Sequence, residues 1–516
     1  MSDLRNDLLN PTLKETLSMF QLDKYYISGQ GSYLLDEKGQ RYLDFISQYG
    51  AVPFGYNPEF IWECLQEVRE KCLPSLVQPS IPQEALKLAN MLADCSPGDL
   101  CYCTFCQSGA EAVEAAIKLA RSSTSRKIIV STTNSFHGKT MGALSATGKE
   151  SYQKPFYAPI PGFITVPYND IAALEQVFAQ QGNNIAAFIV EPVQGEGGII
   201  VAQPGYLAAA REICSTYGAA LILDEIQTGL GRTGRLFACE HENIEPDIML
   251  LAKALGGGLL PLAVCISSPR IWNDDFGMLH SSTFANNNLT CSVGQAVLEK
   301  LLDDEQQLVQ EVARKGDYLL EQLQQLAGRY PDAVKEVRGR GLMLGLEFHD
   351  LKDCGSYDTA FIINSGGFTA LVTGFLLNVY HIRLAPFLND SMTLRLEPAL
   401  NISYEDMDHV VEVLDTVCKI VSYRDFAQFY RYILGDYSKP EQIIDHRHHS
   451  RKTKSSRLKA GEEASEKFAF IIHYPGPEDV VANNPSFASF NRDELYRFLD
   501  WQKGSPGVQI VCHMPA

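Results

Sequence analysis

The sequence lacks the features of a membrane protein or a nucleic-acid-binding protein. No apolar run reaches the ~18 residues that span a bilayer, and residues 1–17 lack the apolar core of a signal peptide. Basic residues are the minority, with 44 Lys and Arg against 62 Asp and Glu and a formal net charge of −18. This charge disfavours binding to nucleic acid or to anionic membranes. We therefore expect a cytoplasmic chain with small-molecule partners, no nucleic acid and no membrane.

The chain also lacks the paired cysteine and histidine spacing of a zinc site. Its 13 Cys are expected to be reduced in the cytosol. Cys103 and Cys106 form a CxxC, but no second pair of Cys or His stands at zinc-like spacing. The alternating segment 101–107 favours a buried strand instead, in which small thiols pack well. We predict no metal.

Five parts are predicted along the chain, whose 45% hydrophobic and 21% charged residues suit a globular protein with a large core. Residues 1–58 form an N-terminal segment, residues 59–329 a large domain and residues 330–430 a small α/β domain. Residues 431–467 have the charged, apolar-poor composition of a linker. Residues 468–516, with one strand pattern and one helix pattern, form an extension too short for a confident core of its own.

Short apolar strands alternate with helical stretches in the large domain. Strands that are apolar on both faces and alternate with helices predict an α/β fold with a mostly parallel seven-stranded sheet covered by helices. Ligands of such sheets bind beyond the carboxyl ends of the strands. The predicted strands are 100–105, 127–131, 162–166, 185–190, 219–223, 248–251 and 262–266.

A candidate phosphate site stands at the start of a helix. Gln107, Ser108, Gly109 and Ala110 follow a predicted strand and open the helix AEAVEAAIKLAR. Helix N-termini present free N–H groups and a positive dipole end, which suit a phosphate. Ser108 adds a hydroxyl donor, and Gly109 lets a ligand come close to the backbone. An ordinary helix cap by Ser108 is the alternative explanation of this segment, because Ser is common before a helix.

Two charged residues stand at the ends of neighbouring predicted strands. Asp224 follows an apolar strand, where its carboxylate can pair with a cationic ring nitrogen or simply cap the next turn. Lys253 follows another apolar strand and precedes three glycines. Burial would lower its pKa and make the amine nucleophilic toward an aldehyde, whereas a surface lysine would keep its amine in water. A phosphate cradle, an acid and a lysine in this order suit a phosphate-bearing cofactor held as a Schiff base.

Seven ordered motifs carry a resemblance to a known family. They are SGAEAVEAAIKLAR, FHGKTMGALSATG, EPVQGEGG, LDEIQTGLGRTG, AKALGGGLLP, STF and RLEP. With these motifs the chain resembles the class III (subgroup II) aminotransferases over roughly residues 20–425. The resemblance implies a fold-type I enzyme with pyridoxal 5'-phosphate as cofactor and ping-pong kinetics, in which an amine and a 2-oxo acid react in turn.

The resemblance implies roles for the residues around the cofactor ring. Lys253 looks like the Schiff-base lysine and the base that moves the proton. Asp224 looks like the partner of the ring nitrogen, and Gln227 resembles the residue that hydrogen-bonds the ring hydroxyl. Phe136 should stack on the ring, and His137 falls in the same cofactor-binding motif.

The resemblance also implies which residues hold the phosphate. Ser108, Gly109 and Ala110 should bind it from one subunit. Thr283 resembles the threonine that reaches the phosphate from a neighbouring subunit, which implies a homodimer with a shared active site. Glu191 matches the first acidic position of EPxQGEGG and is expected to bind the cofactor.

The substrate side is implied by four further residues. Glu196 matches the second acidic position of EPxQGEGG, and Arg395 resembles the arginine that pairs with it and is released for an incoming dicarboxylate. Tyr49 is expected to contact substrate. Lys139 stands where ornithine-, acetylornithine- and aminobutyrate-type members carry Arg in FxGR, and Lys lacks the planar fork that grips a carboxylate.

The FHGK motif is similar to that of the putrescine (diamine) aminotransferases, so the substrate is expected to be a terminal amine without an α-carboxylate. Such an enzyme would degrade a diamine or aminate a biosynthetic aldehyde. Lys139 acting as a point charge in place of Arg keeps an ornithine-, acetylornithine- or 4-aminobutyrate-type enzyme open. A cofactor-binding regulatory domain is disfavoured because Lys253 and Asp224 are both present.

Two segments depart from the family pattern. TFANNNLT, residues 283–290, stands where members have TFGGNPLA, which puts the fit of the substrate in doubt. Residues 468–516 weakly resemble the start of an acyl-carrier-linked reductase-like module. They imply a reductase or carrier-protein partner, with a small surface extension as the alternative.

Overall fold

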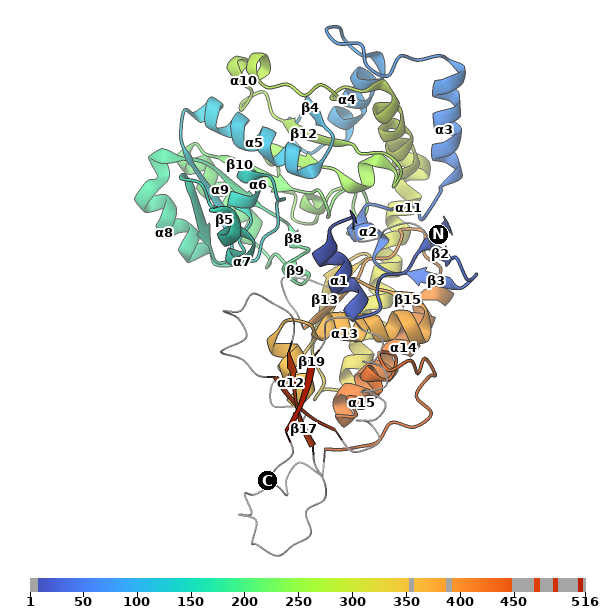
Figure 1. Cartoon of the computed structure of the whole chain (residues 1–516). Helices are drawn as coiled ribbons and strands as arrows, with labels where there is room; N and C mark the ends of the chain where they lie inside the picture. Colours follow the sequence, from blue (N-terminus) through green and yellow to red (C-terminus); the bar gives the residue numbers. More distant parts are fainter. Residues whose placement is uncertain are drawn as a thin grey trace, which may run out of the picture.

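Two α/β lobes share the long helix α11, Asn288–Arg329, which runs through both (Figure 1). The structure is a computed structural model. It describes residues 8–351, 357–386 and 392–447, and the three strands 468–473, 486–490 and 509–513. None of the described helices is long and apolar enough to cross a membrane.

The large lobe is built on a seven-stranded sheet in the order β4-β12-β11-β10-β7-β5-β6. The pairs from β11 to β6 are parallel, and β12 runs antiparallel to both of its neighbours. The predicted mostly parallel seven-stranded sheet is therefore confirmed. The strands are β4 (Tyr102–Cys106), β5 (Ile128–Thr132), β6 (Phe163–Val166), β7 (Ile185–Val190), β10 (Ala220–Asp224), β11 (Ile248–Leu251) and β12 (Ala263–Ser267).

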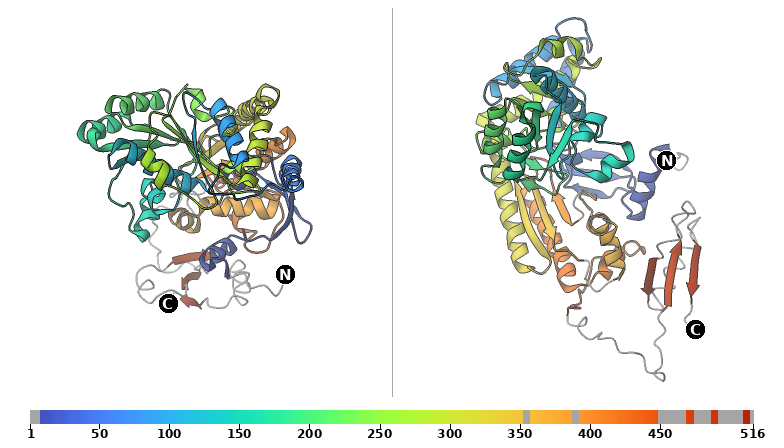
Figure 2. Two further views of the ribbon diagram at one scale, coloured as in Figure 1. Left: turned by 90° about the horizontal axis from the view of Figure 1, so that it is seen from above. Right: turned by 90° about the vertical axis from the view of Figure 1, so that its left-hand side faces the viewer.

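Helices cover both faces of this sheet, as two further views show (Figure 2). The alternation along β10 decides which side chain meets which layer: Leu221 and Leu223 join the core with α4, α9 and α11, whereas Ala220 and Ile222 join the core with α5. The central strands are buried on both faces, which explains their continuous apolar sequences. The helices of this lobe are α3 (Glu59–Glu70), α4 (Gln83–Cys95), α5 (Gly109–Thr124), α6 (Met141–Ala146), α7 (Glu150–Gln153), α8 (Ile171–Gln181), α9 (Tyr206–Tyr217) and α10 (Asp274–Leu279).

One predicted strand differs in its burial. The segment 101–107 was expected to form a buried strand, but β4 is the outermost strand of the sheet and Tyr102 is 44% exposed. The expectation of full burial is wrong because an edge strand has one neighbour only. Cys106 is still buried against α5, and Cys103 packs toward the opposite core.

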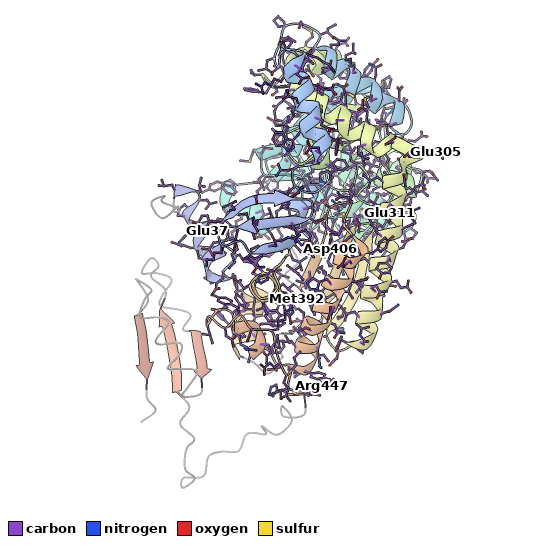
Figure 3. The ribbon with its side chains drawn as sticks, turned by 90° about the vertical axis from the view of Figure 1, so that its right-hand side faces the viewer. Glu37, Glu305, Glu311, Met392, Asp406 and Arg447 are labelled. Carbon is purple, nitrogen blue, oxygen red and sulfur yellow. The ribbon has the colours of Figure 1, made fainter. Side chains whose placement is uncertain are left out.

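The small lobe is built on an antiparallel sheet in the order β13-β14-β16, formed by Val334–Arg340, Met343–Phe348 and Thr393–Leu396. α11 packs on β13 and on α14, Tyr404–Tyr423. α11 breaks at Asp303–Gln306, where three residues take positive φ, and Figure 3 marks this break by the label of Glu305. The remaining helices of the lobe are α12 (Tyr357–Asn364), α13 (Phe368–Phe375), η6 (Leu376–Tyr380) and α15 (Ala427–Tyr430).

The N-terminal segment brings the two lobes together at the site. Helix α1 (Pro11–Met19) precedes a sheet in the order β1-β2-β3-β15, made of Tyr26–Gln30, Tyr33–Asp36, Arg41–Asp44 and Ile382–Arg383. The chain then enters α2 (Ser47–Gly50), a turn in which Ser47, Gln48 and Tyr49 all have positive φ. Left-handed backbone in three successive non-glycine residues is costly, and this turn lies at the site.

The C-terminal extension contains a three-stranded antiparallel sheet in the order β18-β17-β19. Its strands are Ser486–Phe490, Phe468–His473 and Gln509–His513. The strand predicted at the start of this extension is confirmed as β17. The helix predicted at residues 493–502 lies outside the described residues.

Candidate active site

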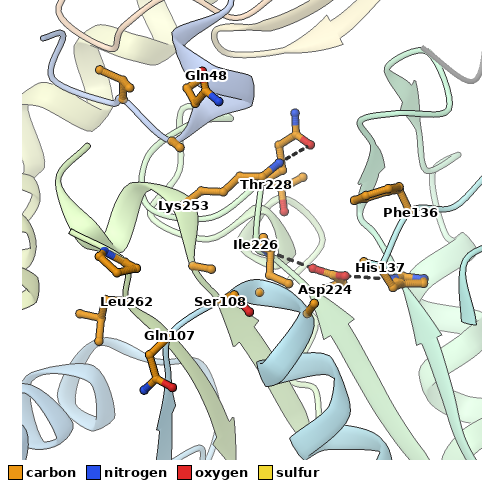
Figure 4. Close-up of a pocket in the computed structure, with 18 of the residues that line it drawn as sticks. Gln48, Gln107, Ser108, Phe136, His137, Asp224, Ile226, Thr228, Lys253 and Leu262 are labelled. Atoms are coloured by element: carbon orange, nitrogen blue, oxygen red, sulfur yellow. Dashed lines mark hydrogen bonds and ion pairs between the residues drawn. The ribbon is translucent and has the colours of Figure 1, made fainter. Parts of the chain in front are cut away.

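One cavity collects most of the residues that the sequence predicts to act together. It has a volume of about 430 Å³, enough for a small cofactor, and it lies where β10 and β11 end and α5 begins (Figure 4). The predicted residues in its lining are Ser108, Gly109, Ala110, Phe136, His137, Glu191, Asp224, Gln227 and Lys253. The predicted residues outside its lining are Tyr49, Lys139, Glu196, Thr283 and Arg395.

Lys253 follows β11 and extends its amine into the cavity (Figure 4). Its Nζ donates a hydrogen bond of 2.8 Å to Oε1 of Gln227. Burial lowers the pKa of Lys253 to about 8, although the carboxylate of Glu397 opposes this shift. The backbone of Lys253 has a φ of 43°, a strained conformation for a non-glycine residue. A lysine with a lowered pKa holds more neutral amine at neutral pH, and the neutral amine is the nucleophile.

The glycines after Lys253 have a packing reason. A Cβ on Gly257, whose φ is +62°, would come 2.9 Å from Cδ1 of Ile61 on helix α3. Gly258, with a φ of +79°, lines the cavity beside Val52. Neighbouring protein therefore approaches these glycines closely.

Asp224 lies at the end of β10 and is 4% exposed. Its Oδ1 accepts a hydrogen bond from the backbone N–H of Ile226, and its Oδ2 lies 2.7 Å from Nδ1 of His137. Burial opposes protonation of His137, but Asp224 outweighs it and raises the pKa of His137. His137 therefore fixes the orientation of the Asp224 carboxylate, while Asp224 itself lines the cavity.

Glu191 lies beside this pair and organises the loop that carries Phe136. Its two oxygens accept hydrogen bonds from the backbone N–H groups of Phe136, at 2.7 Å, and Gly195, at 3.1 Å. Burial raises the pKa of Glu191 to about 7, with His137 acting in the opposite direction. The structure thus gives Glu191 a direct role in holding Phe136 at the cavity wall.

The predicted phosphate end is also a helix cap. Ser108 caps α5 by accepting from the N–H of Glu111, and Glu111 in return accepts from the N–H groups of Ser108 and Gln107. The N–H groups of Gly109 and Ala110, in the first turn, have no partner within a helix. The cap interpretation is therefore confirmed, and it is compatible with a phosphate site, because the cap leaves two N–H groups and the dipole available to an anion.

A second polar cluster lies beyond Gln227 and centres on Arg395 of β16. The Arg395 side chain is fully buried, and its Nη2 pairs with Oε1 of Glu196 at 3.3 Å. Its guanidinium also lies over the ring of Tyr49, at 4.9 Å from the centroid. The structure thus brings together the three predicted substrate residues Arg395, Glu196 and Tyr49.

One further member of this cluster, Glu397, was not predicted from the sequence. This residue is 0% exposed, and its Oε2 lies 3.1 Å from Nε of Arg395. Its Oε1 accepts a hydrogen bond of 2.6 Å from Nε2 of Gln227. A signal for it exists in the motif RLEP, because residues two apart on a strand share a face, so Glu397 follows Arg395 toward the site.

Lys139 lies outside the cavity and is exposed. Its Nζ is 5.0 Å from the ring centroid of Tyr152 and 6.0 Å from that of Phe136. Within the described part of the chain, no carboxylate pairs with Lys139. Tyr152, which was not predicted as a site residue, lies near Glu196 and Arg395, and burial raises its pKa.

Thr283 is exposed and lies outside the cavity of its own chain. The loop that carries it is tied to the phosphate end, since Ser282 Oγ donates to Oε1 of Gln107 at 2.7 Å. In the departing segment 283–290, Asn286 has a φ of 56°, a conformation that Asn tolerates better than most residues. Asn287 caps α11, and Asn288 bonds to the backbone of Pro74 and Glu84.

Several solved structures are similar to this chain. The ornithine aminotransferase of Toxoplasma gondii ME49 is 27% identical, with a TM-score of 0.69 over 82% of this chain and 97% of that one. A thermostable (S)-enantioselective omega-transaminase from Thermomicrobium roseum is 28% identical, with a TM-score of 0.68 over 78% and 92%. The acetylornithine aminotransferase of Elizabethkingia anophelis is 30% identical, with a TM-score of 0.63 over 80% and 99%.

The family model described as "Aminotransferase class-III" matches residues 20–418, which include the sheets of both lobes and every predicted site residue. The cavity fits the cofactor of this family on its own observations: a partly neutral lysine, a buried carboxylate and a helix N-terminus line one space of suitable volume. This chain belongs to the class-III aminotransferases and is a pyridoxal-phosphate-dependent transaminase.

Proposed function

We propose that this aminotransferase transfers an amino group between a terminal (ω) amine, or its aldehyde, and a 2-oxo acid. Lys139 carries the proposal: its single exposed ammonium replaces the forked guanidinium that would grip a substrate carboxylate from two sides. The omega-transaminase among the similar structures supports it. Amination of a biosynthetic aldehyde is the reverse direction of the same reaction. An ornithine- or acetylornithine-type substrate is the second candidate, favoured by two of the similar structures.

Each residue around the cavity is proposed to have its own role in this reaction. Bound pyridoxal phosphate supplies an aldehyde for the amine and a ring that takes up electrons. Lys253 would hold the cofactor through its amine and would serve as the base that removes and returns the proton at the carbon bearing the substrate amine. Asp224 would supply the negative charge for the ring nitrogen, with His137 fixing its orientation, and the start of α5 would hold the phosphate through Gly109 and Ala110.

The 2-oxo acid half of the reaction uses Arg395. Its guanidinium is fully buried, whereas the side chain of its partner Glu196 is 18% exposed. Glu196 is therefore the member of the pair that can turn away and release an N–H edge of Arg395 for a carboxylate. A second carboxylate on the acceptor, as in 2-oxoglutarate, is expected to bind there.

A panel of amine donors tests the substrate class. We expect putrescine or a long-chain ω-amine, with 2-oxoglutarate or pyruvate as acceptor, to convert the visible band of the bound cofactor faster than ornithine or 4-aminobutyrate. Lys139→Arg restores the forked donor and should raise kcat/KM for 4-aminobutyrate by roughly tenfold relative to the diamine. Conversion by ornithine or 4-aminobutyrate alone would show that the substrate class is wrong while leaving the aminotransferase intact.

The same proposal includes a homodimer in which Thr283 reaches the phosphate of the neighbouring subunit's cofactor. Class-III aminotransferases are typically dimeric. In this chain Thr283 is exposed beside Phe284, which is 59% exposed, and Met278 and Leu279 on the preceding helix are both 84% exposed. Exposed apolar side chains grouped in this way fit a protein–protein interface.

Mixed dimers test whether Thr283 acts across the interface. Thr283→Ala should weaken cofactor binding roughly tenfold, because one hydrogen bond to a charged group is lost. Thr283→Ala subunits mixed with Lys253→Ala subunits should regain activity, since hybrid dimers have one site with Lys253 and a partner's threonine. Ser281→Ala in place of Thr283→Ala is the matched control in the neighbouring position. No gain of activity over the unmixed variants would contradict the shared site.

A further inference from the structure

The amide of Gln227 lies between two groups of opposite hydrogen-bonding character. Lys253 Nζ donates to Gln227 Oε1 at 2.8 Å, and Gln227 Nε2 donates to Glu397 Oε1 at 2.6 Å. A carboxylate accepts only and an ammonium donates only. Turning the amide over would place its oxygen against the carboxylate and its amino group against the ammonium. Glu397 therefore permits a single orientation of Gln227.

Glu397 is itself fixed from several sides. It is 0% exposed, and its backbone N–H donates to the carbonyl of Phe45 at 2.8 Å. Its second oxygen lies 3.1 Å from Nε of Arg395. That oxygen has no hydrogen-bond donor of good geometry among the described residues. A buried carboxylate oxygen without a hydrogen-bond donor lowers the free energy of unfolding. Such a cost is typical of a functional site rather than of a packing position.

From this geometry we infer that Glu397 is a positioning residue of the transamination site. It locks the amide of Gln227 and thereby holds the amine of Lys253 in one place in the cavity. The inference rests on the proposed role of Lys253. It adds a link between the two halves of the site, because Glu397 contacts Arg395 of the 2-oxo acid side and Gln227 of the cofactor side.

The orientation of Gln227 has a consequence for the cofactor. The Nε2 amino group carries two hydrogens, and one of them forms the hydrogen bond to Glu397. The other hydrogen remains a donor, which is what an acceptor oxygen on a cofactor ring requires. In the opposite orientation Gln227 would present a carbonyl to such an oxygen and repel it.

The charges around Lys253 come from several elements. Burial lowers the pKa of Lys253, and among the charged groups Glu397, which follows β16, opposes this most, ahead of Glu196 and Asp224; Arg395 lowers it further. A carboxylate at position 397 therefore contributes both charge and geometry.

The buried guanidinium of Arg232 is a further positive charge that interacts with Glu397. Its Nη1 donates to the carbonyl oxygens of Leu342 and Pro398. Burial lowers the pKa of Arg232 to about 10, and Glu397 opposes this shift. Glu397 thus interacts with two guanidinium groups, directly with Arg395 at 3.1 Å and through its charge with Arg232.

The test follows the rate at which the full-length, cofactor-free protein captures pyridoxal phosphate as a function of pH. Only the neutral amine attacks an aldehyde, so in the unchanged protein the rate should rise with pH and level off, with a midpoint at about 8. Glu397→Gln removes the charge and the lock, and should lower the midpoint by about one unit and the plateau rate roughly tenfold. Glu397→Asp keeps the charge, but its shorter side chain moves the carboxylate away from Gln227. The plateau rate should therefore fall, while the midpoint of the pH profile should not change.

A second background separates positioning from general structural damage. In Gln227→Leu protein, Glu397→Gln should no longer lower the plateau rate, because the amide through which it acts is missing. Glu84→Gln, at a buried carboxylate bonded to Lys87 and Gln295 away from the cavity, is the matched control and should leave the profile unchanged.

Three results would overturn the inference. They are an unmoved profile in Glu397→Gln, a plateau in Glu397→Asp equal to that of the unchanged protein, and an equal plateau loss with and without Gln227. If Glu397→Gln does not fold, the Asp variant and the Gln227 background still decide. Capture that persists in Lys253→Ala protein would instead refute the role of Lys253, so the two failures are distinguishable.

Discussion

Replacing Lys253 with alanine is expected to abolish transamination, lowering turnover by at least roughly 10⁴-fold. Lys253 is the amine in the cavity with a pKa lowered to about 8, and its Nζ bonds to Gln227 at 2.8 Å. The variant removes the nucleophile that holds the cofactor and the base that moves the proton. Steady-state turnover and the visible absorbance of the cofactor measure both losses.

Cofactor binding and catalysis should separate in this variant. The start of α5, Asp224 and Phe136 remain, so pyridoxal phosphate should still bind but should be removed by dialysis. Lys71→Ala, at a lysine whose side chain is 63% exposed, is the matched control and should keep full turnover. Turnover in Lys253→Ala protein within tenfold of the unchanged enzyme would refute the assignment.

The sequence predicts the scaffold of the site well, because the scaffold depends on local patterns. Apolar strands of four to six residues followed by a polar residue place Asp224 and Lys253 at one edge of a parallel sheet. The segment Gln107–Ala110 arrives at the same edge, since it also follows a strand and opens a helix. Strand ends and helix starts follow local sequence patterns. The seven strands, and the edge of the sheet at which the cavity lies, could therefore be predicted from the sequence.

The second polar cluster depends on contacts between residues that are far apart in the sequence. Glu397 reaches Gln227 only because β16 of the small lobe lies against the N-terminal segment, with the N–H of Glu397 bonded to Phe45. Tyr49 reaches Arg395 through a left-handed turn that no propensity predicts. The position of Thr283 relative to a neighbouring cofactor depends on a second chain. These features follow from tertiary packing rather than from any local pattern.

Replacing Asp224 with asparagine is expected to lower kcat by about 10²–10⁴-fold while the protein still folds. Asn keeps the size of the side chain and an oxygen that can accept from the N–H of Ile226, so the loop after β10 is retained. It removes the buried charge that faces the cavity. Breaking a buried charge pair costs about 3–5 kcal/mol, which corresponds to this loss if the pair with the ring nitrogen is needed in the transition state.

The geometry also predicts that replacing His137 has a smaller effect on kcat than replacing Asp224. His137 touches Asp224 through Nδ1 at 2.7 Å and is fully buried, so His137→Gln should disturb the orientation of the carboxylate without removing its charge. Its loss of kcat should therefore be smaller than that of Asp224→Asn. Spectra of the bound cofactor and single-turnover rates with a saturating amine separate the two variants.

A second buried aspartate provides the control for charge burial itself. Asp247 is 6% exposed, pairs with Arg211 at 2.7 Å and accepts from the N–H of Leu221, but it lies outside the cavity lining. Asp247→Asn should lower the melting temperature and leave kcat per folded enzyme unchanged. Equal losses of kcat in the two variants would mean that Asp224 acts only through the fold. A loss confined to Asp224→Asn requires its charge to act on the cofactor, because the two carboxylates share burial and ion pairing and differ in facing the cavity.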